Sequence, residues 1–180
     1  MSFFGGFRRP EKKPAGRSSV VMLLPLTSHE AETIAEVISA IRGGRAETIE
    51  RSLLKLQDWD ARRAFVAMRT LANRYIHATL DSVGQDDGQA VRDIGAETLV
   101  ERIQNAIPDG VRLPTVSIFN ATVLSLAAAD FVEGEVSKNP AEAVVALAYV
   151  VAGCASIVYS VEGNKERTLK SMLHGISAPW

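Results

Sequence analysis

Apolar residues recur at helical spacing along most of this chain. In the first such segment, four of them share one face when successive residues are rotated by 100°: Ile34, Val37, Ile38 and Ile41. Thr27, followed three residues later by Glu30, matches the capping box that begins a helix. Gly43 and Gly44 then predict where this helix ends.

The same spacing predicts six further helices, and no run alternates apolar and polar positions as a strand does. Each is bounded by a capping residue, a proline or a glycine. The predicted helices cover residues 46–57, 58 or 60 to about 83, 93–107, 113–132, 140–162 and 165–174, with a loop expected over 84–88. The sequence therefore predicts an all-α fold, a six- to seven-helix bundle.

Two of these helices, 113–132 and 140–162, are unusually apolar, and we expect them at the centre of the bundle. Residues 143–161 carry no charge and are long enough to span a bilayer. Only eight of those residues are Val, Leu or Ile, and the rest are Ala, Gly, Ser, Cys or Tyr, which weakens the membrane signal. A buried core helix is the favoured interpretation, and a membrane span is the alternative.

Composition narrows the class of protein. With 180 residues, 47% hydrophobic and 23% charged, the chain matches one ordinary soluble domain rather than a collagen, a disulfide scaffold or a disordered protein. We expect an extended arm over 1–19, one all-α domain over 20–176 and a C-terminal tail over 177–180. The lone Cys154 permits no disulfide within one chain, so a reducing cytoplasm is the expected compartment. The apolar stretch 20–26 is too short, and too interrupted by proline, to favour a secretory signal.

Charge is distributed unevenly along the chain. Residues 1–17 hold five basic residues against Glu11, a charge of +4, so the total of −1 leaves −5 on the rest. Arginine outnumbers lysine by 14 to 6, and alanine occurs 24 times, a bias typical of high-GC bacterial or phage coding. A basic arm thus precedes an acidic body.

The arm also contains aromatic residues that have nothing local to bury them. Three of the six phenylalanines of the chain lie in its first seven residues: Phe3, Phe4 and Phe7. Arg8 and Arg9 follow them, and Trp180 closes the other end. Large apolar side chains on polar termini predict docking onto a partner. The alternative is that both ends fold back onto the core of their own chain.

A second candidate surface lies on the predicted third helix. Its polar arc gathers Arg62, Arg63, Arg69, Arg74 and His77. Guanidinium groups on one strip are suited to hold phosphates or carboxylates bidentately. The simpler interpretation is a solvated face whose arginines pair with the acidic body.

Signals for an enzyme are weak. The sequence lacks nucleotide-binding glycine motifs, a nucleophile elbow and the His-Glu-x-x-His zinc motif, so no catalytic, cofactor or metal residues are predicted. His29, His77 and His174 fall in three different helices, and Asp130 sits alone in an apolar helix.

These observations favour a non-catalytic helical interaction or assembly protein of bacterial or phage type, cytoplasmic and self-associating as a homo-oligomer or in a larger assembly. The first alternative is an anion-binding protein that holds nucleic acid or acidic lipid through the arm and the arginine face. The second is an enzyme of unknown class around His77 or Asp130.

Overall fold

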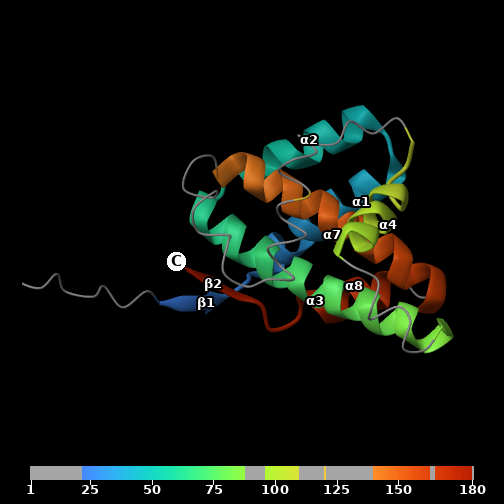
Figure 1. Ribbon diagram of the computed structural model, residues 1–180. Helices are drawn as coiled ribbons and strands as arrows, with labels where there is room; N and C mark the ends of the chain where they lie inside the picture. Colours follow the sequence, from blue (N-terminus) through green and yellow to red (C-terminus); the bar gives the residue numbers. More distant parts are fainter. Residues whose placement is uncertain (1–21, 88–95, 110–119, 121–139, 163–164, 180) are drawn as a thin grey trace, which may run out of the picture.

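A computed structural model describes residues 22–87, 96–109, 120, 140–162 and 165–179 (Figure 1). Helices account for 81% of these residues, so the predicted all-α class is confirmed. The described elements are β1 (Leu23–Pro25), α1 (Ser28–Gly43), α2 (Ala46–Gln57), α3 (Ala61–Asp87), α4 (Ala96–Asn105), α7 (Pro140–Glu162), α8 (Lys165–Leu173) and β2 (Ser177–Pro179).

Helix α1 begins and ends where the sequence predicts. The backbone N–H of Glu30 donates to Thr27 Oγ1 at 3.2 Å, and the backbone N–H of Thr27 donates to Glu30 Oε2 at 2.8 Å, which completes the capping box. Gly44 takes the left-handed conformation, with φ of 70°, that glycine adopts at low cost. All four residues of the predicted apolar face, Ile34, Val37, Ile38 and Ile41, are 0% exposed.

Helix α3 differs from its prediction at the C-terminal end. At the N-terminus, Asp60 Oδ1 accepts a hydrogen bond from the backbone N–H of Arg63 at 3.0 Å, so Asp60 rather than Asp58 caps the helix. The helix then continues to Asp87, and the loop predicted from Gly84 onward is wrong as far as Asp87. A single glycine costs a helix only about 1 kcal/mol, which is too little to end it.

Helices α3 and α7 make the most extensive contact between any two described elements. Met68 and Leu71 of α3, like Val150 and Val151 of α7, are 0% exposed. Among the described residues α7 is the one helix long and apolar enough to cross a membrane, and 67% of that stretch is buried inside the protein. Core helices commonly meet the same criterion, so its length alone does not indicate a bilayer.

Helix α4 approaches α7 closely at Gly153. A Cβ atom placed on Gly153 would lie 2.6 Å from the carbonyl oxygen of Ile103 and 2.7 Å from its Cγ2. Only glycine permits this separation, because a real Cβ atom essentially never comes within 3.0 Å of another heavy atom.

The two strands, which the sequence analysis did not predict, join the beginning and the end of the described chain. β1 and β2 pair antiparallel, with Leu24 opposite Ala178 and Leu23 opposite Pro179. Leu26 N donates to Ile176 O at 3.0 Å and continues this pairing toward the helices. We call this pair of strands, β1 and β2, the ribbon. Figure 1 shows the ribbon projecting from one side of the helical body. Strands of three residues are too short to display alternation, which explains why sequence periodicity missed them.

Several predicted features lie outside the described residues. These are the arm over 1–19, Trp180, and the apolar helix 113–132 with Asp130. Of that helix, only Asn120 is described.

Candidate interaction surface

Arg63 anchors both ends of the described chain to α3. Its side chain is almost completely buried, and the residue is 4% exposed. The guanidinium donates from Nε to Glu30 Oε1 at 2.6 Å and from Nη2 to Glu30 Oε2 at 2.8 Å. It also donates from Nη1 to the carbonyl oxygen of Ala178 at 2.9 Å and from Nη2 to that of Pro25 at 3.1 Å. One side chain therefore joins α3 to the start of α1 and to both strands.

This bidentate pair also sets the protonation of its partner. The pKa of Glu30 is lowered from 4.5 to about 2, mainly by the hydrogen bond from Arg63 and against the opposing effect of burial. The Thr27 donors of the capping box contribute to the same lowering. The same interaction raises the pKa of Arg63. The pair is ionised and its charges are balanced within the chain.

Arg74, the second engaged residue of the predicted arginine face, binds backbone instead of a carboxylate. Its Nη1 donates to the carbonyl oxygen of Met172 at 2.6 Å and to that of His174 at 2.7 Å. These carbonyls lie at the C-terminal end of α8, where a cation is favourable. Two of the four predicted arginines are thus used inside the chain. Arg62 and His77 are exposed and Arg69 is half-buried, and anion binding by them remains a prediction.

The outer end of the ribbon presents apolar side chains to solvent. Met22 is 64% exposed and Leu23 is 58% exposed; with Leu54, they are the exposed large apolar residues in the described part of the chain. Leu23 lies opposite Pro179, the residue before Trp180. The two ends of the described chain, to which the aromatic arm and Trp180 are joined in sequence, therefore lie side by side.

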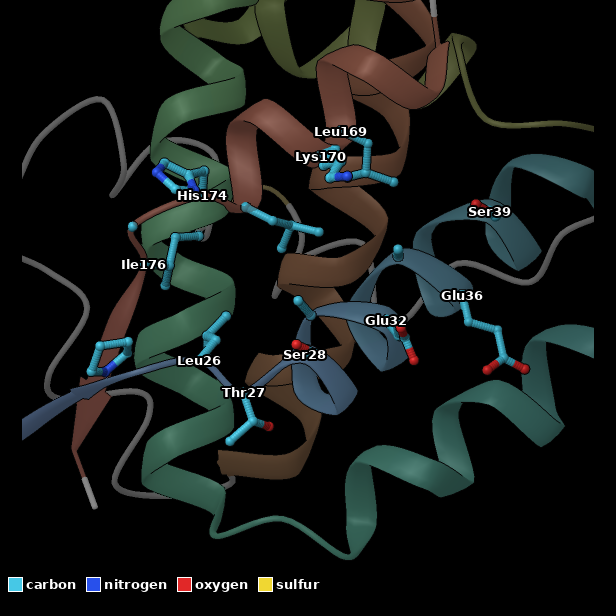
Figure 2. Close-up of a pocket in the computed structure, with 15 residues that line it drawn as sticks. Leu26, Thr27, Ser28, Glu32, Glu36, Ser39, Leu169, Lys170, His174 and Ile176 are labelled. Atoms are coloured by element: carbon cyan, nitrogen blue, oxygen red, sulfur yellow. The ribbon is translucent and has the colours of Figure 1, made fainter.

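A groove with a volume of about 710 Å³ runs between α1 and α8 (Figure 2). It begins at the end of the ribbon next to the helices, at Pro25 and Leu26. Its apolar lining comes from both helices and from the residues flanking the strands: Leu26, Ala31, Ala35, Leu169, Leu173 and Ile176. Figure 2 shows Glu32 and Glu36 on the α1 side, well separated from Lys170 and His174 on the α8 side. The groove is therefore apolar at its base and oppositely charged on its two rims.

A second hollow, of about 960 Å³, lies on the other side of α1, against α2 and the start of α3. Trp59 and Asp58 line it, and it shares Glu32 and Glu36 with the groove. Lys55 Nζ contacts Glu36 Oε2 at 2.6 Å, but both side chains are 47% exposed, so this pair contributes little to stability. Glu32 and Asp58 form no ion pair within the described ranges. The exposed side of α1 is therefore acidic.

A buried polar cluster lies where α1, α3 and α7 meet. The hydroxyl groups of Tyr75 and Tyr159 are 3.0 Å apart, and their rings pack edge to face. Arg42 lies 4.3 Å above the Tyr159 ring and donates from Nε to Ser156 Oγ at 3.1 Å. Burial, and then the hydrogen bond with Tyr159, raise the pKa of the Tyr75 phenol far above its ordinary value. Tyr75 therefore stays neutral at physiological pH.

The histidines do not gather at one site. His29 lines the second hollow, His174 lines the groove, and His77 lines neither. Across the described ranges, no three His, Cys, Asp or Glu side chains are grouped so that they can hold a metal ion.

Comparisons with protein-family models, with curated proteins and with solved structures found no match to this chain.

Proposed function

We propose that this protein is a non-catalytic helical interaction protein that associates with copies of itself through its N-terminal arm and Trp180. One observation supports this most directly: the first and last residues of the described chain lie side by side, at the exposed side chains of Met22 and Leu23. We propose that it is a cytoplasmic protein of bacterial or phage type. It would act there as a homo-oligomer or as part of a larger protein assembly.

The energetics favour a protein partner. Burying a side chain such as Met22 or Leu23 contributes about 1.5 to 3 kcal/mol. Phe3, Phe4 and Phe7 of the arm offer further apolar surface. Together these gains exceed the lower range of the cost of association, which is about 4 kcal/mol or more.

The finer architecture belongs to the same proposal. We propose a six- to seven-helix bundle in which 113–132 and 140–162 are the two apolar central helices. The buried positions of α7 support this for the second of them, and a second apolar helix would cover further apolar surface in the same core.

Light scattering coupled to size-exclusion chromatography tests the proposed association. We expect the full chain to form oligomers that become smaller in a chain starting at Ser18. A full-length variant with Phe3, Phe4 and Phe7 changed to Ser should lose association to the same degree, because it removes only the rings. If the full chain is a monomer, or if both variants associate like it, the proposal is wrong.

Anion binding is the alternative, through the arm together with Arg62, Arg69 and His77. It has less support because Arg63 and Arg74 already bind groups of their own chain. Binding to nucleic acid or to acidic lipid vesicles should weaken by orders of magnitude between about 50 and 200 mM salt, because counterions are released. Binding that does not depend on salt rejects this alternative.

A further inference from the structure

We propose that the groove between α1 and α8 receives the N-terminal arm of a second copy of this chain. This inference rests on the proposed self-association and names the surface that accepts the arm.

Shape and polarity of the groove suit the aromatic part of the arm. Leu26, Ala31 and Ala35 are half-buried, so their apolar surface remains partly open to solvent beside the buried Leu173 and Ile176. A cavity of about 710 Å³ is as large as the pockets that bind small ligands, so it can hold several side chains. The phenylalanine rings of the arm gain most from entering such a site, because their burial there removes the largest apolar surface of the arm from water.

Charge fixes the direction in which the arm lies. The arm carries +4, whereas Glu32 on the α1 rim and Asp58 in the adjoining hollow make no ion pair within the part of the chain that the structure describes. Lys170 stands on the α8 rim, away from Glu32 (Figure 2). The arginines that follow the phenylalanines therefore lie along α1, and the rings lie toward α8.

The course of β1 favours a groove on a neighbouring copy. The chain enters β1 at Leu23 and runs toward the groove, which begins at Pro25 and Leu26. An arm returning to its own groove has to reverse direction and run back along β1, whereas an arm that continues in the direction of β1 reaches a neighbouring copy without a turn. From Met22 to Phe7 the extended chain reaches up to roughly 50 Å, so both grooves are within range, and only crosslinks between copies support the inference.

Two measurements on the full-length protein test the inference. The first is the dissociation constant of self-association for Glu32→Lys. We expect it to weaken association about fivefold, because one favourable charge contact becomes repulsive. Glu50→Lys is the matched control: it makes the same charge change at an exposed position on α2, outside both hollows, and should leave the constant unchanged. Arg9→Glu combined with Glu32→Lys should restore part of the loss.

The second measurement replaces Phe7 with the photoreactive residue p-benzoylphenylalanine in a mixture of light and heavy isotope-labelled chains. Crosslinks between light and heavy chains that map to α1 or α8 support the inference. Crosslinks within one chain only, or between chains at other elements, overturn it. If the full chain associates through its phenylalanines but Glu32→Lys behaves like Glu50→Lys, the groove is wrong while self-association stands. A monomeric full chain overturns both.

Discussion

Arg63 is the residue on which the placement of both chain ends depends. Its guanidinium is buried, yet it binds a carboxylate and two carbonyl groups from segments more than 30 residues away in sequence. Burying an arginine is unfavourable unless its donors are satisfied. No buried side-chain nitrogen or oxygen of the described residues lacks a hydrogen-bond partner. Arg63 thus secures the ribbon from which the proposed docking arm leaves.

Removing this side chain should destabilise the protein strongly. Arg63→Ala leaves Glu30 without its cation and the carbonyl groups of Ala178 and Pro25 without this donor, and we expect a loss of about 3 to 5 kcal/mol in the free energy of unfolding. Urea unfolding followed by circular dichroism measures it. Arg62→Ala is the matched control at an exposed neighbouring position, and it should change stability by less than about 0.5 kcal/mol. Equal effects of the two variants would show that the buried pair does not anchor the fold.

Glu30 gives the pair a defined dependence on pH. Its pKa is about 2 in the folded protein and 4.5 in the unfolded chain, so the unfolded chain takes up the proton first as pH falls. The stabilisation is complete above pH 4.5 and is lost as pH falls toward 2. The difference in free energy of unfolding between the wild type and Glu30→Gln should therefore be largest near pH 6 and shrink below pH 4.5. A difference that stays constant down to pH 2 contradicts this assignment.

At the scale of elements, the contact of α4 with α7 depends on a glycine, Gly153, which has no side chain. Gly153→Ala places a methyl group 2.6 Å from the Ile103 carbonyl oxygen, so one helix has to move. We expect a loss of about 1 to 3 kcal/mol, as for other overpacked cores, although alanine favours a helix. Gly43→Ala is the control: nothing lies within 4 Å of its Cβ position, so it should leave stability unchanged or raise it by about 0.5 to 1 kcal/mol. Thermal unfolding of both variants decides between these outcomes.

Local chemistry explains which elements could be predicted. The capping box at Thr27 and the apolar face of α1 involve residues within one or two helical turns, so the sequence displays them directly. The β1–β2 pairing depends on residues that lie over 150 positions apart, and no short-range pattern encodes it. In the same way, the arginine face of α3 is visible as a polar arc, but the burial of Arg63 depends on where Glu30 comes to lie. The groove was missed because α1 and α8 form it together.

For the whole molecule, the proposed donor and acceptor surfaces belong to the two ends of the ribbon. The described chain begins and ends at the outer end, at Met22 and Pro179, to which the arm and Trp180 are joined in sequence, while the groove opens at the inner end, beside Leu26. A copy that carries both surfaces can give its arm to one neighbour and accept that of another, or exchange arms with a single partner. Exchange closes the assembly as a dimer, whereas a one-way contact extends it into rings or fibres, so the measured mass distinguishes them.

Whether protein rather than lipid encloses helix α7 can be tested at Cys154, which lies on this helix. The thiol is 0% exposed, and burial raises its pKa to about 12, so the reactive thiolate is scarce at neutral pH. We expect Cys154 to resist a thiol reagent in the native protein and to react at once in denaturant. Thr48→Cys in a Cys154→Ser background supplies a thiol at an exposed position of α2, outside both hollows, that should react without denaturant. Because lipid also shields a thiol, the same protein must remain in the supernatant of a high-speed spin without detergent. Rapid native reaction, or recovery in the membrane pellet, would show that protein does not enclose α7 as the described core implies.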